Sequence, residues 1–231
     1  MIINGINLDV LPASDSPFAQ VSNEVDHITV VCVWWGTLYG REYVEKLRDA
    51  VKRHLTIPYE FVVITDRDDD IPGAKIIAAI DDNEGWWQKI TLFKPNLFTG
   101  RILYFDLDIV ITNSIDDIAK SAGELVMIRN FGPNHRTSPH NSSCMVWTPC
   151  EKTENIYTKF TKDVTTNLHG DQCWIGRVGS DFILNFKLPL ITSYKYEKRN
   201  YTRKDHSTAV WVFHGQPNPH EVEDKWVKEN W

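Results

Sequence analysis

The feature of this chain that most constrains its fold is a pair of apolar segments that flank an amphipathic one. Residues 27–35 (HITVVCVWW) and 59–66 (YEFVVITD) are apolar almost throughout, whereas residues 41–55 (REYVEKLRDAVKRHL) repeat apolar side chains at helical spacing. Strands without polar alternation are typical of a parallel sheet that helices cover on both faces. The sequence therefore predicts a doubly wound α/β fold.

The rest of the pattern predicts one domain, residues 1–231, in two halves. A chain of 231 residues, 42% of them hydrophobic, can bury one large core. Residues 1–26 form a polar lead-in in which Asn4-Gly5 could turn a small hairpin. Residues 27–120 resemble a nucleotide-binding sheet, and residues 121–231 mix strands with helices and close over it. We expect a mixed, mostly parallel central sheet flanked by helices. Further strands are predicted at 74–80, 101–105, 124–129, 143–147 and 209–214. Further helices are predicted at 84–93, 151–164 and 171–178.

Composition and charge exclude several classes of function. A net charge of −6 argues against a nucleic-acid partner, because such binding depends on Lys and Arg that neutralise phosphates. The four cysteines show no CxxC pair or metal-like spacing, so we expect reduced thiols. The N-terminus has no signal-like apolar region, and no segment approaches the ~18 apolar residues of a membrane span. We therefore expect a cytoplasmic protein without a transmembrane segment.

Two carboxylates follow the apolar strand predicted at 101–105. In RILYFDLDIVI, Asp106 and Asp108 are two residues apart, so in an extended chain they project to the same side while Leu107 faces the core. Open α/β sheets bind ligands at this end of their strands. Like charges this close repel unless a cation lies between them, so a divalent metal ion is the simplest occupant. The alternative is a surface turn in which both carboxylates are solvated.

A third candidate ligand lies far downstream. His214 ends the strand predicted at 209–214, and Gly215 with prolines at 217 and 219 predicts a rigid turn that a ligand can approach closely. Two carboxylates and one imidazole suit Mn²⁺ better than Mg²⁺ or Ca²⁺, which prefer oxygen ligands. Mn²⁺ is therefore the expected ion, with Mg²⁺ as the second choice. The alternative is a histidine that only packs against its loop.

The order of these motifs resembles that of the GT-A fold glycosyltransferases, most closely the retaining family 8 group that includes glycogenin and the bacterial lipooligosaccharide galactosyltransferases. The likeness rests on VVCVWWGTLYG, LYFDLDIVI, NSSCMVW, GDQ and FHGQPNP, and it spans residues 28–220. It implies a GT-A domain whose second half faces the acceptor. It also implies transfer of a hexose, with retention, from UDP-glucose or UDP-galactose. The acceptor, a carbohydrate, a lipid-linked sugar or a protein, is not indicated.

The resemblance also implies roles for individual residues. Asp106, Asp108 and His214 would hold the metal ion, and Asp171 and Gln172 would act at the reacting sugar. Ordinary alternatives are core packing for Trp34 and Trp35, a solvated surface position for Lys89, and a helix N-cap for Asp171. The residues implied in donor or metal binding are Val33, Trp34, Gly36, Tyr39, Asp66, Lys89, Asp106, Leu107, Asp108, Asn141, Ser142, His214 and Gly215.

Two departures from the family pattern are visible. Ser143 stands where the family has glycine, and Asn218 stands where it usually has a lysine that lies against the diphosphate. The missing charge has two candidate sources, Lys89 and a basic loop that we predict to order over bound donor; the alternative for this loop is a solvated surface segment. The cations of the loop are Lys195, Lys198, Arg199, Arg203 and Lys204.

Two other functions fit part of the sequence. FDLD is similar to the FDLDGT motif of haloacid-dehalogenase-type phosphatases, although that motif normally follows the first strand and continues with Gly-Thr rather than Ile109-Val110. A non-catalytic carbohydrate-binding module with a degenerate transferase fold is the other alternative.

Overall fold

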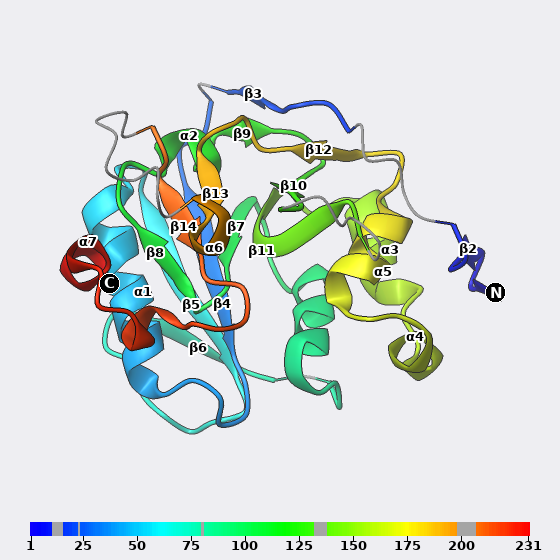
Figure 1. Cartoon of the computed structure of the whole chain (residues 1–231). Coiled ribbons are helices and arrows are strands. Elements are labelled where there is room, and N and C mark those ends of the chain that lie inside the picture. Colours follow the sequence, from blue (N-terminus) through cyan, green and yellow to red (C-terminus); the bar gives the residue numbers. More distant parts are fainter. Residues whose placement is uncertain (11–15, 23, 80, 132–137, 198–206) are drawn as a thin grey trace.

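The central element is a seven-stranded mixed sheet that draws strands from both halves of the chain (Figure 1). The structure is a computed structural model that describes residues 1–10, 16–22, 24–79, 81–131, 138–197 and 207–231. Four neighbouring pairs of the sheet are parallel, and only the two pairs that involve β11 are antiparallel. The strand order is β12 (Ile183–Asn185), β10 (Leu125–Arg129), β11 (His140–Trp147), β7 (Arg101–Phe105), β4 (Ile28–Trp34), β5 (Tyr59–Thr65) and β6 (Lys75–Ala78).

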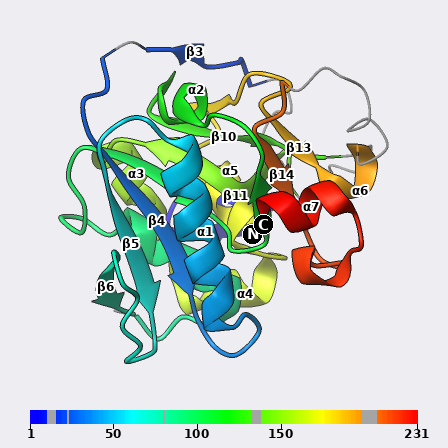
Figure 2. The ribbon, with the colours of Figure 1, turned by 90° about the vertical axis from the view of Figure 1, so that its left-hand side faces the viewer.

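Helices cover both faces of this sheet, which explains why its strands are apolar throughout. Successive residues of one strand enter different cores: Val30 packs on the side of α1 (Arg41–His54), and Val31 packs on the side of Trp174. Figures 1 and 2 show α1 on one face and α3 (Glu151–Thr158) and α5 (Asp171–Val178) on the other. The predicted α/β architecture is confirmed.

Three features of the fold differ from the sequence prediction. The helix expected at 84–93 is a 3₁₀ helix, η1 (Gly85–Phe93), and the helix expected at 151–164 is divided into α3 and α4 (Lys162–Asn167). A second sheet of three strands, β13 (Ile191–Ser193), β14 (Val210–Val212) and β8 (Ile109–Ile111), was only partly anticipated, because β8 and β13 are too short for a periodic signal.

Shorter elements complete the described chain. Asn4 and Gly5 adopt positive φ angles of 49° and 83° and turn the small hairpin β1–β2, as predicted. None of the helices within the described ranges has the length and apolar character that a bilayer crossing requires. The remaining elements are β1 (Ile2–Ile3), β2 (Ile6–Asn7), β3 (Gln20–Val21), α2 (Asp116–Ala119), β9 (Ser121–Ala122), α6 (Tyr194–Glu197), η3 (Pro219–Glu221) and α7 (Lys225–Asn230).

Candidate active site

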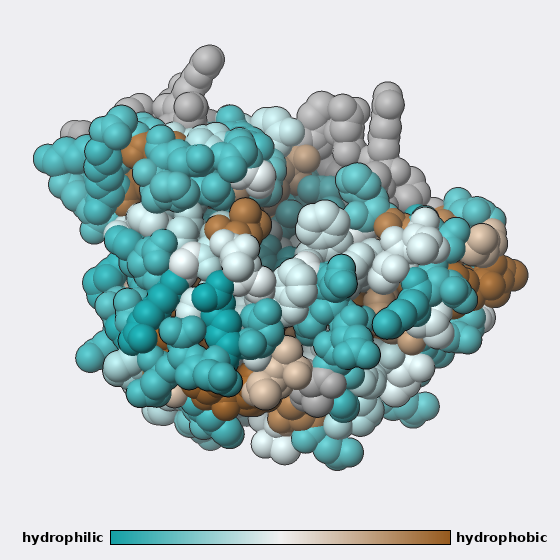
Figure 3. Space-filling view, turned by 90° about the horizontal axis from the view of Figure 1, so that it is seen from below, coloured by the Kyte–Doolittle hydropathy of each residue, from teal (hydrophilic) through white to brown (hydrophobic). Residues whose placement is uncertain are grey.

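A cavity of about 680 Å³ lies at the C-terminal ends of β4 and β7. Its walls come from the loop after β4, the start of η1, the segment after β7, the bulged part of β11, the start of α5 and the turn after β14. The surface is hollowed near its centre when the molecule is viewed from below, the end toward which β4 runs in Figure 1 (Figures 1 and 3). This is the edge at which open α/β sheets bind ligands.

The two aspartates lie where the chain passes from the large sheet to the small one. Strand β7 ends at Phe105, as predicted, and β8 begins at Ile109; Asp106 and Asp108 lie in a bend between them, which corrects the expectation of an extended chain. The bend is held by hydrogen bonds from Asp106 N–H to Ser143 C=O (2.9 Å) and from Phe213 N–H to Asp108 C=O (3.0 Å). Both carboxylates nevertheless line the cavity, as does Leu107.

Lys89 is the centre of the polar network in this cavity. It is only 9% exposed, so the surface position that was the alternative for this lysine is wrong. Its Nζ lies 2.8 Å from Asp106 Oδ1 and 3.5 Å from Asp171 Oδ2, and it donates a 3.2 Å hydrogen bond to Ser142 Oγ. Residues from η1, the bend, β11 and α5 thus meet around one buried ammonium group.

The charges in this network shift one another's pKa. Burial lowers the pKa of Lys89, but the charges of Asp106 and Asp171 outweigh burial and raise it. Burial, and next the charge of Asp106, raise the pKa of Asp108 to about 7. Burial also raises the pKa of Asp171, although the ammonium of Lys89 opposes the effect. Three carboxylates therefore share the cavity with one lysine, and a further cation would be stabilised there.

His214 lines the same cavity from the turn after β14. Its Nε2 lies 2.7 Å from Ser193 Oγ, and its ring stacks on Phe131 with the ring centroids 5.4 Å apart. Burial, and next the charge of Lys195, lower the pKa of His214 and favour the neutral imidazole that can bind a metal ion. Gly215 has a φ of +70°, and Lys195 Nζ lies only 3.2 Å from where a β-carbon of Gly215 would stand.

The donor set fits a divalent ion only in part. Asp106 and Asp108 supply two carboxylates to one cavity, which is the chemistry that hard cations prefer. Across the ranges that the structure describes, however, no three His, Cys, Asp or Glu side chains stand close enough together to hold a metal ion.

The bulge in β11 explains how its serines reach the cavity. Pairing with β10 jumps from Met145 to Asn141, which leaves the intervening residues out of register. Asn141 Oδ1 accepts a 3.0 Å hydrogen bond from Ser143 N–H, and Ser142 Oγ donates to Asp171 Oδ2 at 2.5 Å. All three β11 residues line the cavity.

Asp171 is the first residue of α5 and does not cap the helix. Gly170 occupies the N-cap position without a side-chain bond, and the Asp171 carboxylate contacts Ser142 and Lys89 instead. Gln172 also lines the cavity, next to Asp171. The functional interpretation of Asp171 is therefore compatible with its position.

The loop after β4 contributes a different tryptophan from the one singled out in the sequence. Trp34 is 1% exposed, packs in the core and donates from Nε1 to Tyr39 C=O, whereas Trp35 lines the cavity. Val33, Gly36 and Tyr39 line it as well, and Tyr39 OH donates to Asp108 Oδ2 at 3.2 Å. Asp66 accepts two 3.2 Å hydrogen bonds from Gly36 N–H but lines a neighbouring cavity.

Sequence reasoning missed several wall residues, of which Tyr104 and Trp86 are the largest. Tyr104 donates its hydroxyl hydrogen to Asp106 Oδ1, a role that its place in an apolar strand concealed. Trp86 is 58% exposed at the cavity, three residues before Lys89 on η1. The only signal for both was their spacing, because residues two apart in a strand or three apart in a 3₁₀ helix share a side.

Asn218 has a structural role that the sequence did not reveal. It is 8% exposed and its side chain caps η3, while its N–H donates to Glu221 Oε2 at 2.5 Å. In the predicted basic loop, Lys198, Arg199, Arg203 and Lys204 lie outside the described residues, and Lys195 is the described member.

Comparison with known proteins identifies the fold. No protein-family model and no curated protein sequence matches the chain. Solved structures do match the chain, among them three glycosyltransferases. GlyE, a glycosyltransferase of Streptococcus pneumoniae, is 14% identical with a TM-score of 0.60 over 83% of this chain. The galactosyltransferase LgtC, solved with donor and acceptor sugar analogues, is 10% identical (TM-score 0.62, 84% of this chain covered), and the bifunctional glycosyltransferase WbbM is 12% identical (TM-score 0.59, 88% of this chain covered). The chain spans 56% of GlyE and 49% of WbbM but 90% of LgtC. The chain therefore has the GT-A fold of these glycosyltransferases.

Proposed function

We propose that the chain is a metal-dependent glycosyltransferase that moves a hexose from UDP-glucose or UDP-galactose to an acceptor with retention of configuration. The observation that carries the proposal is the meeting of Asp106, Asp108 and Asp171 with Lys89 in one cavity at the C-terminal edge of the sheet. The likeness to LgtC, whose structure was determined with donor and acceptor sugar analogues, supports the proposal of sugar transfer.

Asp106 and Asp108 are the residues that would bind Mn²⁺, with His214 as the third protein ligand. The bound ion would supply a Lewis acid that neutralises charge on the leaving diphosphate. The protein orients these ligands through hydrogen bonds from Tyr104 to Asp106 and from Tyr39 to Asp108. Such fixed outer contacts hold ligating carboxylates in place.

Lys89 and the residues of the β11 bulge would contact the donor sugar. The ammonium of Lys89 fixes Asp106 and Asp171 relative to each other and can donate to a donor oxygen in the cavity. Asn141 and Ser142 present amide and hydroxyl groups suited to sugar hydroxyls. Retention requires either a double displacement, for which Asp171 or Gln172 would be the nucleophile, or a front-face reaction in which the leaving diphosphate accepts the acceptor proton.

The proposal is tested by the thermal stability of the protein with UDP. We expect UDP to raise the Tm with Mn²⁺ and not with EDTA, because the two carboxylates repel a diphosphate that no metal bridges. UDP at about 100 times its Kd adds about 2.7 kcal/mol of stability, which is readily measured. Asp108→Asn should abolish the shift, and Asp117→Asn, an exposed carboxylate on α2, should keep it.

Two outcomes would replace the proposal. Equal stabilisation by UDP in EDTA would show that UDP binding does not depend on a metal ion. Binding of free glycans without any nucleotide affinity would favour the non-catalytic carbohydrate-binding alternative. If turnover is found, proton NMR of the first product should show the anomer of the donor, and the inverted anomer would contradict retention.

A further inference from the structure

Trp86 is a large exposed aromatic side chain at the rim of the candidate active site, and the roles given above do not use it. It is 58% exposed and lines the cavity from η1, whereas the next residue, Trp87, is buried and packs against Phe160 with the ring centroids 5.5 Å apart. Among the exposed large apolar side chains in the described ranges, only Trp86 and Leu38 line this cavity. Exposed apolar side chains that gather at a concave site indicate a surface that a ligand covers.

The start of α5 holds the ring of Trp86 in place. The atoms nearest to where a β-carbon of Gly170 would stand are Nε1, Cδ1 and Cε2 of Trp86, at 3.4, 3.7 and 3.9 Å. The pyrrole part of the indole therefore lies against the backbone of Gly170, and a larger side chain at this position would press on the ring. Helix η1 itself packs against α3 and α5. Trp86 thus presents a large aromatic surface that is anchored on one side and open to the cavity.

This anchored ring lies next to the groups proposed to act on the reacting sugar. Gly170 directly precedes Asp171, and Lys89, which pairs with Asp171, follows Trp86 by three residues, one turn of a 3₁₀ helix. Lys89 is buried and Trp86 is exposed, so η1 contributes a cation to the floor of the cavity and a ring to its rim. A group that stacks on Trp86 would therefore lie on the solvent side of the donor sugar, which is where an acceptor must approach.

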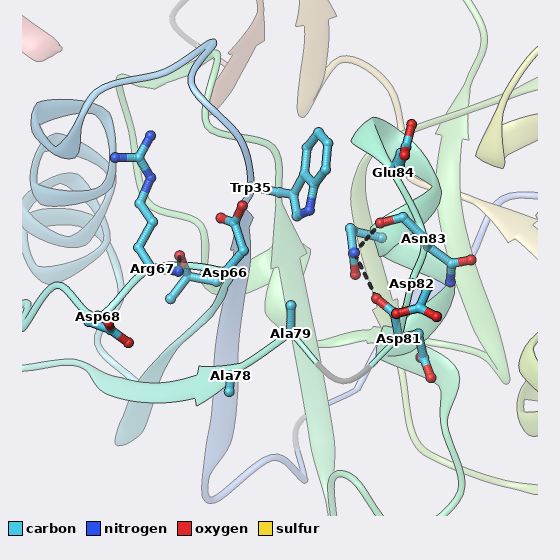
Figure 4. A pocket seen from close by; sticks show the side chains of 12 residues that line it. Trp35, Asp66, Arg67, Asp68, Ala78, Ala79, Asp81, Asp82, Asn83 and Glu84 are labelled. Atoms are coloured by element: carbon cyan, nitrogen blue, oxygen red, sulfur yellow. Dashed lines mark hydrogen bonds between the residues drawn. The ribbon is translucent and has the colours of Figure 1, made fainter.

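A different tryptophan, Trp35, serves the nucleotide side of the site. Trp35 also lines the neighbouring cavity of about 510 Å³ beyond the C-terminal ends of β5 and β6. Figure 4 shows its ring between Asp66 on one side and Asn83 and Glu84 on the other. Asp66 is among the residues implied in donor binding, and Trp86 is not part of the wall of this neighbouring cavity. Trp35 is therefore the ring available to the nucleotide, which leaves Trp86 for another ligand.

We propose that Trp86 is the stacking surface for the acceptor, and that the acceptor hydroxyl belongs to a pyranose ring. The inference rests on the proposed transferase function and adds a substrate class to it. A pyranose carries C–H groups on its faces and hydroxyls at its edge, so it can cover an indole while its hydroxyls stay hydrogen-bonded. The exposed imidazole of His169, which also lines the cavity, can bond such hydroxyls. An acyl chain fits less well, because it would cover polar wall residues such as Asn141 and Ser142 without bonding them.

The inference is tested by titrating the whole protein, with UDP and Mn²⁺ present, with the methyl pyranosides of glucose, galactose, mannose and N-acetylglucosamine, observed by saturation-transfer NMR. We expect at least one of them to bind with one face of its ring close to the protein. Trp86→Ala should weaken this binding about five- to thirtyfold, the range for truncating a tryptophan that anchors a ligand. Trp86→Tyr, which keeps an aromatic face, should retain most of the affinity. The matched control, Phe18→Ala, removes an aromatic side chain that is 41% exposed and does not line the cavity, and it should bind like the wild type.

The affinity for UDP with Mn²⁺ should be the same in Trp86→Ala and in the wild type. A loss of UDP affinity in Trp86→Ala overturns the inference, because the ring would then stack on the base. Pyranoside binding that Trp86→Ala leaves unchanged also overturns it. So does the absence of pyranoside binding to the wild type, whether or not N-acetylserinamide or N-acetyltyrosinamide, which represent a protein acceptor, binds instead. In all these cases UDP with Mn²⁺ still raises the Tm of the wild type, and its failure to do so would instead contradict the proposed function.

Discussion

Replacing Lys89 by methionine should destabilise the protein far more than a surface charge change does. Removing one partner from a buried ion pair costs about 3–5 kcal/mol, because the other charge stays buried without compensation. The side chains of Lys89, Asp106 and Asp171 are 11%, 19% and 7% exposed, so we expect the lower end, about 3 kcal/mol. In a chain of this size 1 kcal/mol corresponds to about 2–4 °C, so the Tm should fall by about 6–12 °C.

Thermal and urea unfolding of Lys89→Met and of a matched control measure this effect. Lys94→Met removes a lysine of the same helical region that is 32% exposed and 3.7 Å from Asp81, and it should cost less than about 1 kcal/mol. The loss in Lys89→Met should shrink at low pH, where Asp171 becomes protonated, and Asp171→Asn should partly restore stability. Equal stability of the two lysine variants would refute the idea that Lys89 compensates buried carboxylates.

Three further predictions concern single residues. Asp108→Asn should abolish turnover yet raise the Tm, because it removes a buried charge beside Asp106; a lower Tm would show that the pair does not repel. Burial lowers the pKa of His140 to about 4, so between this value and its ordinary value the imidazole is protonated in the unfolded chain and neutral in the folded one. Stability should therefore fall as the pH drops from about 6.5 to 4, by up to about 3 kcal/mol, and His140→Phe should flatten this part of the profile. Asn218→Lys should cost about 1 kcal/mol through loss of the η3 cap and should not tighten UDP binding, as calorimetry can check.

The sheet could be predicted from the sequence because its signal, a run of apolar residues, lies within each strand and recurs from strand to strand. Continuous apolar strands around the helix at 41–55 require two covered faces, and β4, α1 and β5 appear within one residue of their expected limits. Helix α5 likewise matches its predicted range, 171–178. The Asn4-Gly5 turn needed only the tolerance of these residues for positive φ.

The candidate site could be predicted from the sequence only as a set of residues, not as an arrangement. The FDLD motif and His214 could be selected as polar groups beside apolar strands, and Asp171 through the resemblance of GDQ to the family pattern; the structure brings all of them to one cavity. Sequence alone could not choose between Trp34 and Trp35, because they are neighbours at the end of one strand and only packing decides which ring is buried.

Which charged side chains are buried and paired depends on the tertiary structure alone. Lys89 is buried because residues from the bend after β7, from β11 and from α5 converge on it, and a lone lysine in a helix sequence carries no sign of that. Asp106 and Asp108 share a cavity because the chain passes between two sheets, one of which is built from strands of three residues that no periodicity reveals. Composition and periodicity determine which faces are apolar, since burial acts on each residue along the chain. The pairing of charges depends on distances between residues far apart in sequence, which only the folded chain fixes.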